Sequence, residues 1–126
     1  MTRIEHAQEL RSRTDVHINC AQAVMMVFAD KMGITEEQAR ALGTYFGSGM
    51  GRGRTCGTLT GALMVLGMAG GTNSDVRELW QRFGDAHVGT DCRDLLAAST
   101  AAGMPRKVHC DGLIYEVIGI LEDLLA

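Results

Sequence analysis

Apolar residues recur along the chain at intervals of three and four positions, which is the period of a helix with one buried face. The stretch that begins near residue 19 shows this spacing at Cys20, Ala23, Val24, Val27 and Phe28. The two-residue alternation typical of strands is not evident in any segment. The pattern therefore predicts an all-α protein.

Helix boundary residues divide this pattern into seven expected helices. They begin near residues 3, 19, 35, 56, 74, 91 and 110. Asn19-Cys-Ala-Gln22 and Thr35-Glu-Glu-Gln38 match the capping box, in which the first side chain and a Gln three residues later bond each other's backbone N–H groups. No linker or low-complexity run interrupts the pattern, so residues 1–126 are expected to form a single-domain bundle of about six to seven helices.

Composition and charge narrow the class of function. The net charge of −3 over 126 residues gives no electrostatic reason to expect nucleic-acid binding. The most apolar run, Gly61–Gly71, is too short to cross a bilayer, so it predicts a buried helix and no membrane insertion. The N-terminal residues lack the apolar core of an export signal, so the expected location is cytoplasmic.

All four cysteines stand where the pattern predicts that a helix begins. They occur in the pairs Asn19-Cys20, Thr55-Cys56, Asp91-Cys92 and His109-Cys110. Unpaired N–H groups and the helix dipole stabilise a thiolate at a helix N-terminus and lower its pKa. In a reducing compartment, four such cysteines indicate metal binding or redox chemistry rather than structural disulfides.

The spacing of the cysteines is compatible with one shared site. The intervals from Cys20 to Cys56 and from Cys56 to Cys92 are both 36 residues, and each holds two expected helices. Every second helix of an antiparallel bundle starts at the same end, so these three would share an end. Simple alternation places Cys110 at the other end, but the connector 102–109 is long enough to return it.

Basic residues and glycines surround the cysteines in the sequence. Arg52 and Arg54 precede Cys56, and cations near a thiol lower its pKa further. His17, His87 and His109 also lie near cysteines, but each alone is interpreted as a surface or capping residue.

The segment 47–55 carries four glycines in seven residues, which predicts a loop with unusual backbone geometry. Gly57 and Gly61 follow, one helical turn apart, and clear one helix face for a cofactor or for another backbone. The Gly-Lys-Ser/Thr ending of a phosphate-binding loop is absent.

These residues carry a family resemblance that covers the chain from about Asn19 to Cys110. Asn19-Cys-Ala-Gln-Ala23, the segment from Gly49 through Cys56-Gly57-Thr-Leu-Thr-Gly61, and the later Cys92 and Cys110 resemble the C_GCAxxG_C_C family of redox-active four-cysteine proteins. Thr58 stands where the motif usually has Ala. A similar cysteine module occurs in split-Soret-type cytochromes with an iron–sulfur centre, but this chain lacks their Cys-x-x-Cys-His haem motif. The resemblance implies redox activity.

The leading hypothesis is an iron–sulfur cluster for electron transfer, ligated by Cys20, Cys56, Cys92 and Cys110. Gly57 and Gly61 would give the cluster room, and Arg52 and Arg54 would offset its charge. The alternatives are metal-free thiol–disulfide exchange by the same cysteines, a structural zinc site, and no joint site at all. Electron transfer implies a redox partner protein, and exposed apolar faces on the shorter helices would support a homodimer.

Overall fold

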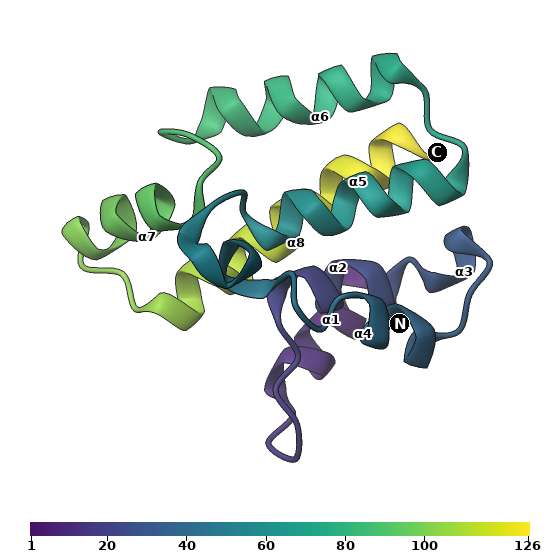
Figure 1. Cartoon of the computed structure of the whole chain (residues 1–126), viewed down its shortest axis with the longest axis horizontal. Coiled ribbons are helices and arrows are strands. Elements are labelled where there is room, and N and C mark those ends of the chain that lie inside the picture. The colour runs from purple at the N-terminus through teal and green to yellow at the C-terminus, as the bar shows by residue number, and fades with distance from the viewer.

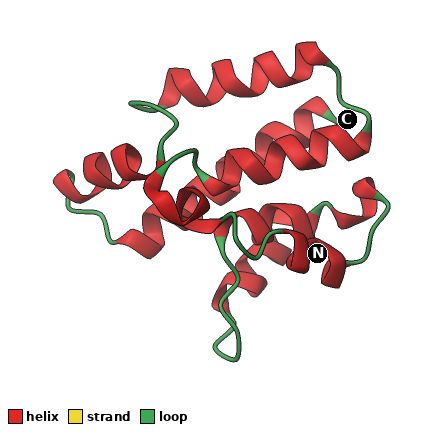
Figure 2. Cartoon of the chain, viewed as in Figure 1, coloured by secondary structure: helices red, strands yellow, loops and turns green.

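The computed structural model describes all 126 residues as helices joined by loops, with no strand (Figure 2). The helical segments are α1 (Arg3–Ser12), α2 (Cys20–Val27), α3 (Ala29–Met32), α4 (Glu36–Leu42), η1 (Gly49–Gly53), α5 (Gly57–Ala69), α6 (Asn73–Ala86), α7 (Cys92–Ala101) and α8 (Arg106–Leu124). The all-α class is confirmed, but the count of six to seven helices is wrong. Nine segments form, because Phe28 interrupts the second expected helix and the glycine-rich segment closes into a short turn of its own.

Three helices, α2, α5 and α8, form the centre of the molecule. α5 packs most extensively against α2, and α8 packs against α1, α2 and α5. Figure 1 shows α6 along one side of this centre, α7 at one end, and α3 and α4 beside α2. Fully buried side chains from different helices, including Val24, Leu59, Phe83 and Ile114, belong to one continuous core. One core is consistent with the small size of the chain.

Capping boxes fix the starts of α2 and α4 as the sequence predicts. The side chain of Asn19 accepts from the Gln22 N–H at 2.8 Å, and the Gln22 side chain accepts from the Asn19 N–H at 2.8 Å. Thr35 and Gln38 form the same reciprocal pair before α4. Local sequence is sufficient for these boundaries because both partners lie within four residues.

The last helix begins earlier than the sequence pattern predicts. α8 starts at Arg106, directly after Pro105, whereas the expected start is near Cys110. Proline fixes φ near its helical value and needs no N–H partner, so a helix can begin beside it. Cys110 consequently lies one turn inside α8 rather than at its start.

None of the helices combines the length and the apolar content that a membrane span needs.

Candidate functional site: a cavity lined by four cysteines

One cavity of about 460 Å³ lies where several helices begin, and all four cysteines line it. Cys20, Cys56, Cys92 and Cys110 come from the start of α2, the start of α5, the start of α7 and the first part of α8. All four are free thiols. The fold thus gathers sulfur atoms from four separate helices around one space, which we call the cysteine cavity.

The capping residues of α2 hold Cys20 in place. Cys20 is the first residue of α2, directly after the N-cap Asn19. The Asn19 side-chain amide also donates to the Gly43 carbonyl at 3.0 Å. The Gln22 amide donates to the Arg40 carbonyl at 2.9 Å. These bonds tie the start of α2 to the end of α4 and so fix the position of Cys20.

A short antiparallel contact holds Cys56 near Cys92. The Cys56 N–H donates to the carbonyl of Thr90 at 2.8 Å. The Cys92 N–H donates to the carbonyl of Arg54 at 2.6 Å. Because side chains alternate across such a ladder, Cys56 and Cys92 occupy diagonal positions on the same face.

Cys110 reaches the cavity from within α8, so the expectation that all four cysteines stand at helix starts is wrong for this one. Its neighbour Asp111 accepts from the Arg11 guanidinium at 2.7 Å, and this ion pair joins α8 to α1. The Lys107 ammonium lies 3.0 Å from the same carboxylate. The position of Cys110 is therefore set by contacts between α8 and α1 rather than by a helix cap.

Gly57 is required where α2 meets α5. A Cβ at this position would lie 2.3 Å from the Cys20 Sγ and 2.9 Å from the Phe46 carbonyl oxygen. Gly57 lines the cavity, whereas Gly61 is buried against α2, where a Cβ would lie 3.0 Å from the Ala21 carbonyl oxygen. Gly61 thus allows close helix packing and does not contact the cavity.

The two arginines singled out in the sequence are not among the lining residues. Arg52 is exposed, and Arg54 is exposed with its Nε 3.7 Å from the Asp91 carboxylate. The loop that carries them has the unusual backbone that its glycines predict. Gly49 has a φ of 61°, and a Cβ there would lie 2.4 Å from the Arg54 backbone nitrogen. The loop therefore supports the Arg54–Cys92 hydrogen bond without directing its arginines into the cavity.

Four other cations line the cavity, namely Arg11, Arg13, Arg106 and Lys107. The sequence interpretation missed Arg106 and Lys107 because it began the last helix at Cys110, and it missed Arg11 and Arg13 because only tertiary packing brings them to the cavity. A helix that starts at Arg106 places residues three and four positions before Cys110 on the same face as that cysteine. The i, i+4 spacing was thus the signal that could have found Arg106.

Of the three histidines near cysteines in the sequence, two line the cavity and one has a structural role. His17 and His109 line the cysteine cavity. His87 does not, because its Nε2 lies 2.7 Å from the Glu116 carboxylate and its ring packs on Phe83. Burial lowers the pKa of His109, and the nearby His87 lowers it further. A neutral His109 adds polarity to the cavity wall rather than fixed charge.

Burial raises the pKa of Cys56 to about 11, and repulsion from Cys20 and Cys92 adds to this shift. The Thr58 hydroxyl opposes it, since its Oγ1 lies 3.0 Å from the Cys56 Sγ. Thr58 is fully buried. The residue that departs from the usual family motif therefore contacts a cavity sulfur directly.

Cys92 and Cys110 also have pKa values above that of an exposed thiol. Burial raises the pKa of Cys92 and of Cys110, and in both cases the charge of Cys20 adds to the rise. Arg106 opposes both shifts, and Arg11 opposes that of Cys110. The expected lowering of these pKa values by helix termini and neighbouring cations is wrong for these cysteines, because burial and repulsion between sulfurs outweigh it.

The donor set suits a group that takes thiolate ligands. Four sulfurs line the cavity, and no Asp or Glu is among its lining residues. At the same time, no three Cys, His, Asp or Glu side chains are arranged to hold a single metal ion.

The fold and the cavity together define a small helical protein built around a four-cysteine site. A family model described as "Putative redox-active protein (C_GCAxxG_C_C)" matches residues 18–124, and the chain belongs to this family. This confirms the family that the cysteine and glycine pattern indicated, and it supports a redox role. Searches of curated proteins and of solved structures found no match.

Proposed function

We propose that Cys20, Cys56, Cys92 and Cys110 ligate an iron–sulfur cluster that serves in electron transfer. The observation that carries this proposal is that four cysteines from four helices line one cavity. Thiolates are the usual ligands of such clusters, and four suffice for a [2Fe–2S] or a [4Fe–4S] centre. When bound, the cluster would supply a reversible one-electron couple.

The charges around the cavity support the proposal. Burial and repulsion between charged sulfurs favour the protonated form of three of the four thiols. Four thiolates are therefore unfavourable in the metal-free protein. Iron would replace the protons and remove this repulsion. The cations Arg11 and Arg106 then offset the negative charge of the ligated centre.

The apolar and the polar side chains next to the four cysteines have separate roles. Leu95 and Leu113 are buried residues of the cavity wall and limit the access of water to the sulfurs. The Thr58 hydroxyl is placed to donate to the Cys56 sulfur, and hydrogen bonds to ligand sulfurs raise the potential of such centres. The backbone contacts of Cys56 and Cys92 keep two ligands fixed during electron transfer.

The test is anaerobic purification of the full chain followed by iron, sulfide and zinc analysis. We expect a coloured protein that contains iron and acid-labile sulfide and bleaches on reduction. Replacing Cys56 by Ser is expected to remove most of the iron, because this residue begins the central α5 and is 5% exposed.

The matched control is Thr60→Ser, which lies one turn further along α5 and outside the cavity lining. Its iron content should equal that of the wild type. One zinc per chain with no redox response would contradict the proposal, as would unchanged iron content in Cys56→Ser.

Metal-free thiol–disulfide exchange is the second candidate, and the neighbouring positions of Cys56 and Cys92 favour it. Diagonal residues of an antiparallel pair lie about 7–8 Å apart, close to the distance that a disulfide spans after a small backbone movement. None of the four cysteines is already in a disulfide. A colourless protein that loses two free thiols on mild oxidation would support exchange and contradict the cluster.

A further inference from the structure

Three exposed arginines lie together where the turn η1 packs against α7, outside the cysteine cavity. Arg52 lies in η1, Arg54 directly follows this turn, and Arg93 is the second residue of α7. The last two are neighbours in space, because the Asp91 carboxylate lies 3.7 Å from Arg54 and 3.9 Å from Arg93. None of the three lines the cavity, so ligation of a cluster leaves them without a role.

These arginines keep their hydrogen-bond donors free. The carboxylates of Asp91 and Asp94 lie 3.7–3.9 Å from Arg54 and Arg93, which is too far for a hydrogen bond. Arg82 on α6, by comparison, donates to a carboxylate at 2.9 Å. The side chains of Arg54 and Arg93 are 59% and 61% exposed. A planar guanidinium with free donors is well suited to binding a carboxylate from another molecule.

An exposed methionine stands on the same turn in a backbone conformation that its residue type rarely adopts. Met50 has a φ of 61° and is 42% exposed. A left-handed backbone is unfavourable for a residue with a long side chain, and Met50 recovers little of this cost by burial. Strained residues of this kind are concentrated at functional sites. Met and Arg are also enriched at the centres of protein–protein interfaces, where Lys and Glu are depleted.

The backbone beneath these side chains is bonded directly to the cysteine cavity. The Arg54 carbonyl accepts from the Cys92 N–H at 2.6 Å, and Cys56 follows Arg54 by two residues. A protein bound over Met50 and the arginines would therefore lie beside the cavity wall that carries two of the four sulfurs.

We propose that Met50, Arg52, Arg54 and Arg93 form a docking surface, the arginine surface, for an acidic electron-carrier protein. This inference rests on the proposed electron-transfer function. The chain carries a net charge of −3, so an acidic partner is repelled by most of the molecule and attracted here, which orients it toward the cavity. The exposed methionine favours a protein over a nucleic acid, because apolar contacts lie at the centre of protein interfaces.

The test measures equilibrium binding of the full chain, purified anaerobically, to flavodoxin, a small acidic electron carrier. We expect binding at low salt that weakens as salt is added. No binding at low salt would overturn the proposal, as would tighter binding of a short DNA duplex. A dimer of this chain that dissociates when the arginines are replaced would also overturn it, because the occupant would then be a second copy.

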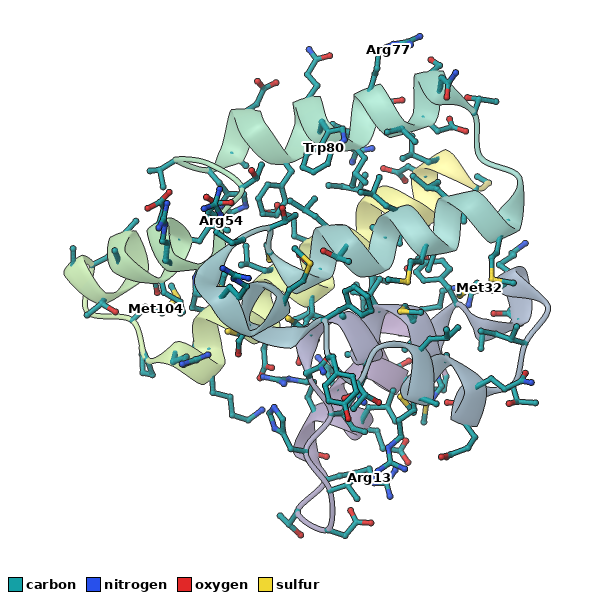
Figure 3. All side chains as sticks on the ribbon, in the orientation of Figure 1. Arg13, Met32, Arg54, Arg77, Trp80 and Met104 are labelled. Carbon is teal, nitrogen blue, oxygen red and sulfur yellow. The ribbon has the colours of Figure 1, made fainter.

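The double variant Arg52→Gln, Arg93→Gln should weaken flavodoxin binding by about tenfold, which is the loss of two exposed ion pairs. The matched control is Arg77→Gln, Arg82→Gln, which removes the same charge from α6. Arg77 is exposed and points away from the molecule (Figure 3). Equal losses in the two double variants would show an effect of net charge alone and would overturn docking at the arginine surface.

Met50→Asn separates the apolar contact from the charges. Asn tolerates a left-handed backbone, so this variant should be as stable as the wild type. Its flavodoxin binding should be weaker by about fivefold at low and at high salt, because the lost contact is apolar. Unchanged binding would overturn the role of Met50.

Iron content is measured in each of these variants and should equal that of the wild type, because none of the replaced residues lines the cavity. Wild-type protein that contains iron but does not bind flavodoxin would overturn the docking surface alone. Iron-free protein that binds flavodoxin would overturn the cluster alone.

Discussion

Thr58 shows how one buried hydroxyl alters the chemistry of a cysteine. Both Thr58 and Cys56 lie inside the protein, and the hydroxyl is placed to donate to the sulfur at 3.0 Å. This contact stabilises the thiolate against the burial that raises its pKa to about 11. An Ala at this position would be smaller and would leave the sulfur without a donor.

Replacing Thr58 by Val should raise the pKa of Cys56 further. In the reduced, metal-free protein near pH 9, a higher pKa means a smaller thiolate fraction, so alkylation of Cys56 becomes slower. We expect a decrease of about fivefold, which corresponds to about 1 kcal/mol of hydrogen-bond energy. Mass spectrometry of iodoacetamide-treated protein measures the rate for each cysteine.

Thr58→Ser is the control because it keeps the hydroxyl, and its rate should match that of the wild type. The greater nucleophilicity of a less acidic thiol reduces the effect but does not reverse it. A Val variant that alkylates as fast as the Ser variant would show that the hydroxyl has no influence on Cys56.

At the scale of the elements, the junction of α2 and α5 sets the geometry of the site. The two helices approach so closely that the Cys20 sulfur occupies the space of a Gly57 side chain. This approach is what brings a residue of α2 and a residue of α5 to the same cavity wall. The absence of a side chain at position 57 is therefore required for the geometry of the site as well as for helix packing.

Gly57→Ala should destabilise the fold and displace Cys20. Its Cβ would overlap the Cys20 Sγ and the Phe46 carbonyl, and relief of overpacking of this kind typically costs about 1–3 kcal/mol. Chemical denaturation measures the loss, and reduced iron incorporation reports the displacement.

Gly67→Ala tests the same substitution further along α5, where an added Cβ meets nothing within 4 Å. This variant should be more stable than the wild type by about 0.5–1 kcal/mol, because Ala has the higher helix propensity. Similar effects at positions 57 and 67 would argue against the close contact with Cys20.

The elements also show which parts of the fold the sequence can predict. The starts of α2 and α4 follow from capping boxes, whose partners are three residues apart. The start of α6 is less well predicted, because the pattern places it near residue 74 whereas the capping box is formed by Thr72 and Asp75. The start of α8 at Arg106 differs from the prediction because Arg106 falls within the segment 102–109, which the sequence analysis takes as a connector.

At the scale of the whole molecule, the Arg11–Asp111 ion pair joins two helices that are distant in the sequence. Arg11 also donates to the Ile18 carbonyl at 2.7 Å, so the same side chain binds α8 and the segment before α2. The Arg11 side chain is only 9% exposed. Its charge is therefore shielded from water and depends on Asp111 for compensation.

Asp111→Ala should lower the free energy of unfolding by about 2–3 kcal/mol, because it leaves a largely buried guanidinium without its carboxylate. Thermal or chemical unfolding measures the loss.

Asp123→Ala is the comparison, since Asp123 pairs with Arg82 at 2.9 Å on the surface and is 65% exposed. An exposed pair is worth at most about 1 kcal/mol. Equal losses in the two variants would mean that burial of Arg11 has no energetic consequence.

The placement of the four cysteines around one cavity could be predicted only in part. Equal 36-residue intervals suggested a common end for Cys20, Cys56 and Cys92, because helix alternation is a regular property of bundles. The approach of Cys110 depends on contacts between α8 and α1, which no local pattern encodes. The cationic lining was missed for the same reason, since Arg11 is brought there by tertiary packing.

The separation of the four cysteines along the chain also determines when the site can exist during synthesis. Cys20 and Cys56 leave the ribosome early and belong to the two helices that pack most extensively. Cys110 emerges last, on the helix that closes the core. The fourth cysteine therefore reaches the cavity only when the C-terminal helix docks, so the four-cysteine site and the folded core are completed together.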